Sequence, residues 1–157
     1  MSNRLAAFEK ITRIAGLLGS APEEAISSSH PFDERNIHPD INIVSIKLFD
    51  DGHYSQATFE AFKLIDLRVK AISNVKDSGY KLMMTAFAET SPRIKLTSLA
   101  TQSEIDEQMG YKFIFAGAMS AIRNPRGHEI SIDPIGRCLD HLSLASVLLR
   151  RLEEAVP

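Results

Sequence analysis

The chain has 157 residues, of which 44% are hydrophobic and 24% are charged, a composition typical of a single globular domain rather than of a disordered segment. The formal net charge of −2 provides no overall positive field, so any contact with nucleic acid requires a local group of cations. The single cysteine, Cys138, excludes an intrachain disulfide and is expected to be a small core residue.

Residues 4–18 are predicted to form an amphipathic helix, because their apolar residues recur every three or four positions. These positions are Leu5, Phe8, Ile11, Ile14 and Leu18. Charged residues interrupt the stripe, whereas a signal peptide needs an unbroken apolar run and a membrane span needs about 18 apolar residues. We therefore expect no membrane partner and a cytoplasmic protein.

Residues 19–36 are rich in serine, contain Pro22 and Pro31, and have no sustained periodicity, which predicts a linker or a loosely packed crossing. The expected organisation is therefore an N-terminal helix and linker over residues 1–36, followed by a compact helical domain over residues 37–157. The N-terminal helix docks either on this domain or on a partner, and the sequence leaves both alternatives open.

Three helices are predicted between Pro39 and residue 88. The first begins at Pro39, which suits the first helical turn, and ends at Asp51-Gly52. The second spans residues 54–74, and the third is short and spans residues 80–88. The second helix has an apolar seam with alternating spacings of four and three residues, formed by Thr58, Phe62, Ile65, Val69 and Ile72. Glu60 and Lys63 lie on its more polar side, which favours a solvated face.

A loop is predicted over residues 89–101, anchored by Ile94, Leu96 and Leu99. Thr101 and Glu104 resemble a capping box, which opens a further helix. That helix is expected to end near Arg123, because Asn124 precedes a proline and is therefore disfavoured in the α conformation. A turn through Gly127 and a short extended piece are expected to follow.

The last helix is predicted to be capped by Asp133-Pro134 and to run to about Ala155. Its apolar residues cover most of its circumference, so the helix is either central in a bundle or shared with a second subunit. These residues are Leu142, Leu144, Ala145, Val147, Leu148 and Leu149. For a domain of this size the second alternative is favoured. Strand patterns are essentially missing, so the expected fold is an all-α bundle that forms a homodimer.

Arg123 and His128 are the strongest candidates for chemistry. Arginine is a permanent, bidentate ligand for phosphate, and histidine changes its protonation near neutral pH. Arg126 adds a second cation in the same segment, and Glu129 is placed to orient the imidazole of His128. The alternative is structural, because Asn-Pro-x-Gly is a turn composition and an arginine in the last turn suits the helix dipole. The chemical alternative is cleavage of a phosphodiester without a metal.

The segment from Arg123 to His128 resembles the Arg-polar-x3-His signature of the HEPN superfamily, and the chain over residues 37–155 resembles its Ymh branch. Further segments carry this resemblance, namely His38-Pro39, Phe49 to Tyr54, Phe59-Glu60-Ala61, Lys81-Leu82-Met83 and Phe113 to His128. The resemblance implies a four- or five-helix bundle, here with an additional N-terminal helix, which dimerises and places the motif of each subunit in a shared cleft. Many such domains are metal-independent endoribonucleases of toxin–antitoxin or phage-defence systems.

The resemblance implies catalytic roles for Arg123 and His128 and makes Asn124 the adjoining polar residue at the substrate. Arg126 is expected to be an auxiliary phosphate contact, although the family signature does not require it. The implied reaction is attack of the ribose 2′-OH on the adjacent phosphorus, with His128 as general acid or base and Arg123 stabilising the phosphoryl charge. The expected partners are RNA, a second copy of the chain and a possible antitoxin or other regulatory protein.

No cofactor or metal is expected. His-Glu-x-x-His and paired Cys-x-x-Cys patterns are missing from the sequence, which disfavours zinc. Asp50 and Asp51 beside His53 suit a helix end and a turn better than a cation site. Two other functions remain open, namely a non-catalytic HEPN module that binds RNA or a partner protein, and a structural interaction protein.

Overall fold

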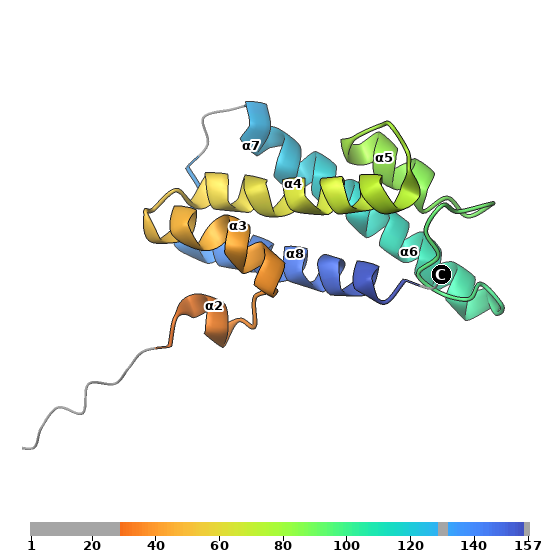
Figure 1. The fold of residues 1–157 in the computed structure, drawn as a ribbon, viewed down its shortest axis with the longest axis horizontal. Helices are drawn as coiled ribbons and strands as arrows, with labels where there is room; N and C mark the ends of the chain where they lie inside the picture. Colours follow the sequence, from red (N-terminus) through yellow and green to blue (C-terminus); the bar gives the residue numbers. More distant parts are fainter. Residues whose placement is uncertain (1–28, 129–131, 156–157) are drawn as a thin grey trace, which may run out of the picture.

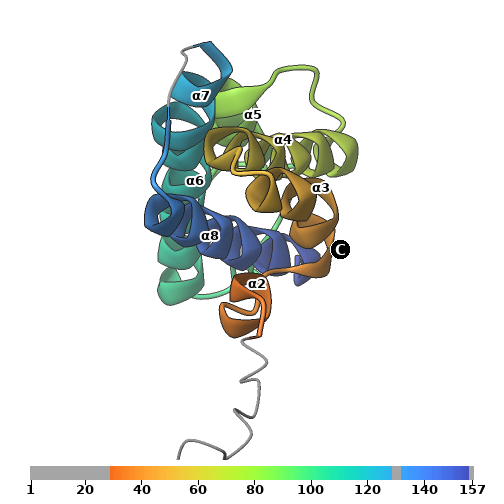
Figure 2. The same ribbon diagram turned by 90° about the vertical axis from the view of Figure 1, so that its left-hand side faces the viewer.

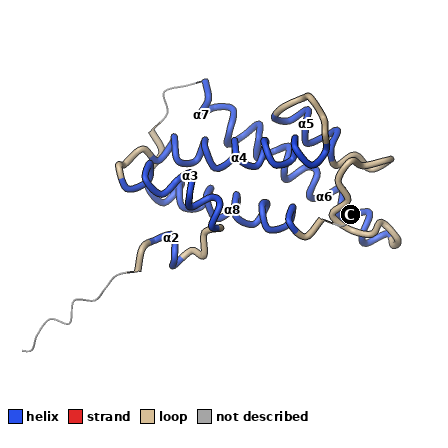
Figure 3. Tube along the Cα trace, in the orientation of Figure 1, coloured by secondary structure: helices blue, strands red, loops and turns tan. Residues whose placement is uncertain are grey.

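The structure is a computed structural model that describes residues 29–128 and 132–155. The regular secondary structure of these residues is helical, and none of them lies in a β-strand (Figure 3). The predicted all-α class is therefore confirmed. Within the same part of the chain, no helix has the length and apolar character needed to cross a membrane. The predicted helix over residues 4–18, and Glu129, lie outside the described residues.

The helices form a bundle in which α4 lies against both α3 and α8, while α5 lies against α4 and α6 (Figures 1 and 2). In chain order they are α2 (Pro31–Glu34), α3 (Pro39–Asp50), α4 (Tyr54–Ser73), α5 (Gly79–Ala86), α6 (Gln102–Ala118), η1 (Met119–Arg123), α7 (Asn124–His128) and α8 (Ile135–Glu153). Large apolar side chains from α4, α5, α6 and α8 fill the centre, and the rings of Phe87 and Phe115 stack there with centroids 4.6 Å apart. Burial of this apolar surface is the main force that holds the helices together.

Two His-Pro pairs begin α2 and α3 with the same arrangement. Nδ1 of His30 and Nδ1 of His38 each accept a hydrogen bond of 3.1 Å from the backbone N–H two residues later. Nε2 of each ring faces a carboxylate, Asp50 at 3.0 Å for His30 and Glu153 at 3.1 Å for His38. Each imidazole therefore acts as a helix N-cap, and the proline that follows occupies the first turn without needing a donor.

The predicted linker over residues 19–36 contains α2, which packs on the bundle. Phe32 is only 1% exposed, and Arg35 forms a 2.5 Å ion pair with Asp140 of α8. The backbone carbonyl of Asn36 accepts a 2.7 Å hydrogen bond from Arg150, also in α8. The folded unit therefore begins before residue 37. The composition of residues 30–36 did not predict α2, because a helix of one turn is too short to show a periodic pattern.

The predicted seam of α4 is confirmed at Thr58, Phe62, Ile65 and Val69, all of which are buried. The prediction is wrong for the last position of the seam, because Ile72 is 53% exposed and Ser73 is buried instead. An α-helix turns 100° per residue, so a seam repeated every 3.5 residues drifts off the core side after several turns, and the four-residue step from Val69 to Ser73 corrects the drift.

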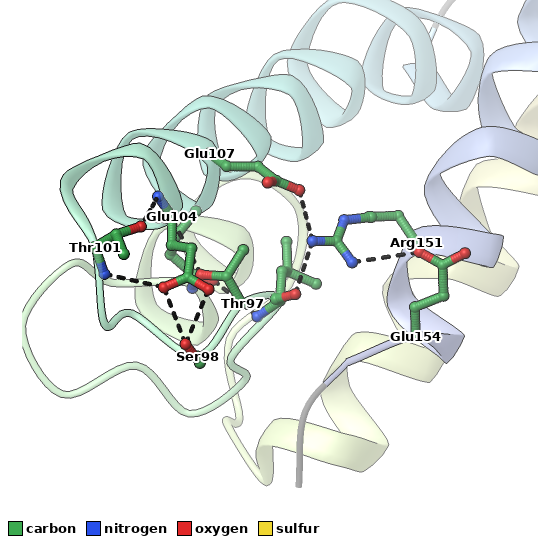
Figure 4. Close-up of polar contacts among 9 residues, drawn as sticks. Thr97, Ser98, Thr101, Glu104, Glu107, Arg151 and Glu154 are labelled. Atoms are coloured by element: carbon green, nitrogen blue, oxygen red, sulfur yellow. Dashed lines mark hydrogen bonds and ion pairs between the residues drawn. The ribbon is translucent and has the colours of Figure 1, made fainter.

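The capping box that begins α6 is confirmed and also fixes the preceding loop (Figure 4). The Glu104 carboxylate accepts hydrogen bonds from Ser98 Oγ (2.9 Å) and from the backbone N–H groups of Ala100 (2.8 Å) and Thr101 (3.0 Å). The bond from Ser98, followed by those from the backbone, lowers the pKa of Glu104. Arg151 of α8 ties the same loop down through Leu96, whose carbonyl accepts a 2.7 Å hydrogen bond.

The helix that begins at Gln102 does not end near Arg123, so that prediction is wrong. The chain continues through the π-helical turn η1 into α7, and the three segments form one diagonal rod in Figure 1. Pro125 has no backbone N–H, and its ring crowds the carbonyl one turn earlier. In η1 the N–H of Asn124 bonds to the carbonyl of Met119, five residues back, and this wider turn accommodates the proline.

The last helix begins as predicted but without an aspartate cap, because Pro134 is the N-cap residue and no side chain bonds to the helix start. Four of the six apolar residues that suggested a shared helix, Leu142, Ala145, Leu148 and Leu149, are buried within the chain. Val147 is exposed and Leu144 is half-buried. The pattern is thus explained mainly by the central position of α8, and dimerisation stays a prediction.

Candidate functional site

Arg123, the last residue of η1, directs its side chain toward α4. Its guanidinium carbon Cζ lies 5.4 Å from the centroid of the Phe59 ring, and Nη1 donates a 3.2 Å hydrogen bond to Oδ1 of Asn124. Nε is buried and has no hydrogen-bond partner among the residues that the structure describes. Unlike Arg126 and Arg151, Arg123 has no carboxylate partner in the described part of the chain. A half-buried cation without a counter-ion is well suited to bind an anion.

The ring of Phe59 in α4 limits how closely α7 packs against α4. A Cβ atom placed on Gly127 would lie 2.8 Å from Cε2 of the Phe59 ring, which is below any normal contact distance. The absence of a side chain at residue 127 therefore allows the ring to sit against α7 and beneath the guanidinium of Arg123. Phe59 was not predicted as a site residue from the sequence, because only the packing of α4 against α7 places it beside Arg123.

His128, the last residue of α7, is exposed to solvent. It is five positions after Arg123, and in an ideal α-helix this spacing separates two side chains by about 140° around the axis. No hydrogen bond between these two described residues is formed. The predicted turn would have held them together, whereas the helix places Arg123 against α4 and His128 toward solvent.

Asn124 lies beside Arg123 and near the start of α5. Its Oδ1 accepts the hydrogen bond from Arg123 and would lie 3.9 Å from a Cβ atom added to Gly79, the first residue of α5. The structure thus brings Arg123 and Asn124 together, as the motif suggested, and adds Phe59 to them.

Arg126 has a buried internal partner, Asp133. Its Nε and Nη2 donate hydrogen bonds of 2.5 and 2.7 Å to the two carboxylate oxygens of Asp133, and Nη1 donates one of 2.7 Å to the carbonyl of Ile122. Burial raises the pKa of Asp133, but the hydrogen bond and charge of Arg126 outweigh burial and hold that pKa below its usual range. The two side chains are only 8% and 3% exposed, which favours a structural role over the predicted phosphate contact.

His141 of α8 is influenced by the charges of this buried pair. Burial, followed by the positive charges of Arg126 and Arg137, lowers the pKa of His141 despite the opposing charges of Asp133 and Asp140. Nδ1 of this ring is buried and has no hydrogen-bond partner in the described part of the chain, which agrees with a poorly solvated site.

We expect the free energy of unfolding to decrease between pH 7.5 and pH 5.5. A histidine with a lowered pKa in the folded state binds fewer protons than in the unfolded chain, so its stabilisation is present above the unfolded pKa of about 6.5 and is lost as the pH falls through the folded value. Urea unfolding of the wild type and of His141→Gln at both pH values measures the effect. The same pH dependence in both proteins would contradict it.

His38, Asp40 and Glu153 offer ligand atoms within 4.8 Å of one another and form a candidate metal group. A metal on Nε2 of His38 would require the ring proton on Nδ1, but Nδ1 accepts the capping hydrogen bond from Asp40. Asp40 also forms a 2.6 Å ion pair with Arg68. These contacts favour a helix cap at the start of α3 over a metal centre.

Comparison with known proteins identifies one family over most of the folded region. A family model described as a protein of unknown function (Hypoth_ymh) matches residues 35–152, a range that includes Arg123, Asn124 and His128. No curated protein and no solved structure shows significant similarity to the chain. The predicted resemblance to Ymh proteins is thus confirmed, whereas membership of the HEPN superfamily stays a prediction.

Proposed function

We propose that this chain, which belongs to the Hypoth_ymh family of proteins of unknown function, is a metal-independent endoribonuclease of the HEPN type. The observation that carries the proposal is the state of Arg123, a half-buried arginine with an unpartnered Nε and no carboxylate partner among the described residues. The exposed imidazole of His128 follows in the same helical rod.

The proposed reaction is an internal transesterification of RNA. The ribose 2′-OH loses its proton and attacks the adjacent phosphorus, the bond to the 5′ oxygen of the next nucleotide breaks, and that oxygen gains a proton. His128 transfers a proton in this step, because an imidazole can both accept and donate a proton through its ring nitrogens. Arg123 stabilises the charge on the phosphoryl oxygens. The products are a 2′,3′-cyclic phosphate and a 5′-OH.

The experiment that tests this function incubates the purified protein with labelled single-stranded RNA in excess chelator. Cleavage is expected to proceed, and an otherwise identical strand with 2′-deoxyribose at the preferred site is expected to stay intact there, because the nucleophile is missing. Dependence on an added divalent metal, or equal cleavage of the deoxy-substituted strand, would contradict the proposal.

We also propose that the enzyme acts as a homodimer through the outer face of α6. Phe113 and Ile114 on this helix are 52% and 45% exposed, and α6 leads directly into η1 and α7. A two-fold partner there duplicates Arg123 and His128 beside one cleft, which supplies the local positive charge that the whole chain lacks. By the resemblance described above, a phage-defence or toxin setting and a regulatory antitoxin also belong to this proposal.

Ile114→Lys is expected to convert the dimer to a monomer, because a buried lysine without a partner opposes association. Light scattering coupled to size-exclusion chromatography measures the change. Ile43→Lys is the matched control, since Ile43 on α3 is 78% exposed and lies on another helix. A monomeric wild type, or a dimer that survives Ile114→Lys, would contradict this interface.

A non-catalytic RNA-binding module is the second candidate, and one observation favours it. His128 has no hydrogen-bond partner among the described residues, so nothing in that part of the chain fixes its orientation as a proton-transfer group. RNA that binds in a salt-sensitive manner but stays intact would support this candidate over the nuclease.

A further inference from the structure

One face of α4 carries a row of polar and aromatic side chains beside the proposed site. Phe59 and Glu60 each lie three or four positions from both Gln56 and Lys63, so the four side chains lie on one side of the helix. Arg123 contacts this row at Phe59, so the row extends the site along α4.

Two cations flank the ring of Phe59. Cζ of Arg123 lies 5.4 Å from the ring centroid, and Nζ of Lys63 lies 5.9 Å from it. The negative face of an aromatic ring attracts cations, so the ring of Phe59 is a common contact for both side chains. Arg123 has no carboxylate partner among the described residues, whereas Lys63 also pairs with Glu60. Phe59 is half-buried and stays in contact with solvent.

Lys63 is also held from its own helix. Its Nζ donates hydrogen bonds of 3.3 and 3.1 Å to the two oxygens of Glu60, and Oε1 of Glu60 accepts a further bond of 2.9 Å from Gln56. The Lys63 side chain is 46% exposed, compared with 88% for Lys47, which forms a similar intrahelical pair on α3. Lys63 is therefore less exposed than a lysine on the fully solvated helix face that the sequence predicted.

We infer that Lys63 is a second phosphate-binding residue of this site. Arg123 binds the phosphate that reacts, Lys63 binds another phosphate of the same RNA strand, and Phe59 positions the two side chains through its contact with each. Glu60 holds the ammonium of Lys63 beside the ring and leaves it partly exposed to solvent. The inference rests on the proposed function, because it takes RNA as the ligand, and it adds that the strand runs from α7 along α4.

The test measures binding of a fluorescein-labelled single-stranded RNA by anisotropy between 0.05 and 0.5 M KCl, for the wild type, Lys63→Met, Lys63→Arg and the matched control Lys47→Met. The logarithm of the association constant falls linearly with the logarithm of the salt concentration, and one lost phosphate contact makes this slope less steep by about 0.7. The same loss weakens binding about fivefold at 0.1 M salt. This is the result expected of Lys63→Met, whereas Lys63→Arg retains the charge and is expected to match the wild type, as is Lys47→Met.

Equal slopes for Lys63→Met and Lys47→Met would overturn the inference. Arg123→Ala, measured in the same titration, separates this failure from that of the proposed function. If Arg123→Ala weakens binding and Lys63→Met does not, RNA binds at the motif and only the second phosphate contact is wrong. If neither variant differs from the wild type, or the wild type does not bind, both the inference and the proposed function fail.

Discussion

Replacement of His128 by alanine is expected to reduce the rate of RNA cleavage by about 10²–10⁴-fold, because a positioned proton-transfer group contributes acceleration of this size. Arg123→Ala is expected to cost about 10²–10³-fold, the usual effect of removing one preorganised charge-stabilising donor. Both variants are expected to fold. His128 is exposed, and the one hydrogen bond of the Arg123 guanidinium to a described residue goes to the neighbouring Asn124.

Single-turnover cleavage of labelled RNA in excess chelator measures these rates. His53→Ala and Arg93→Ala are suitable controls, because both residues are exposed, and His53 forms no capping hydrogen bond. The controls are expected to retain the wild-type rate. Full activity in His128→Ala would remove the imidazole from the mechanism, and full activity in Arg123→Ala would remove the observation on which the proposed function rests.

The second large effect is expected on stability. Asp133→Ala leaves the guanidinium of Arg126 buried without its carboxylate, and breaking a buried ion pair from one side costs about 3–5 kcal/mol. The free energy of unfolding in urea is therefore expected to decrease by about 3 kcal/mol or more. The Arg126–Asp133 pair joins α7 to a residue just before α8, so its loss loosens this connection. The backbone N–H of residue 133, which donates to Ser55 of α4, is kept in the variant.

Asp140→Ala is the matched control for this measurement. Asp140 pairs with Arg35 at 2.5 Å, but its side chain is 70% exposed. Exposed ion pairs contribute about 0–1 kcal/mol, so the control is expected to lose little stability. Similar losses in Asp133→Ala and Asp140→Ala would show that the Arg126–Asp133 pair does not have the structural role that its burial indicates.

Most helices could be predicted from the sequence because their signals are local. Pro39 at a first turn, Asp51-Gly52 at a helix end and the Thr101–Glu104 capping box act within a few residues, and the structure confirms each of them. The continuation past Arg123 was not predictable in the same way. The preference of Asn124 against the α conformation is local, but a π turn and contacts of α7 with α4 override it.

Only part of the candidate site could be predicted from the sequence. The motif identifies Arg123, Asn124 and His128, whereas the surroundings of Arg123 depend on how α4 packs against α7. The burial of Arg126 against Asp133 could not be predicted either, because it also depends on how the chain packs. The local sequence does not distinguish an arginine at the surface from one in a buried ion pair. Gly127 was interpreted as part of a turn, whereas in the structure its missing side chain leaves room for the ring of Phe59.

The most direct test of the central claim is the chemical identity of the ends produced when the wild-type protein cuts RNA in excess chelator. Mass spectrometry of the fragments is expected to show 2′,3′-cyclic phosphate and 5′-OH ends, the products of attack by the 2′-OH, and Arg123→Ala is expected to yield few of them. Fragments with 5′-phosphate and 3′-OH ends would contradict the proposed mechanism, because water rather than the ribose would then be the nucleophile. RNA that stays intact would contradict the proposal that this chain is a nuclease.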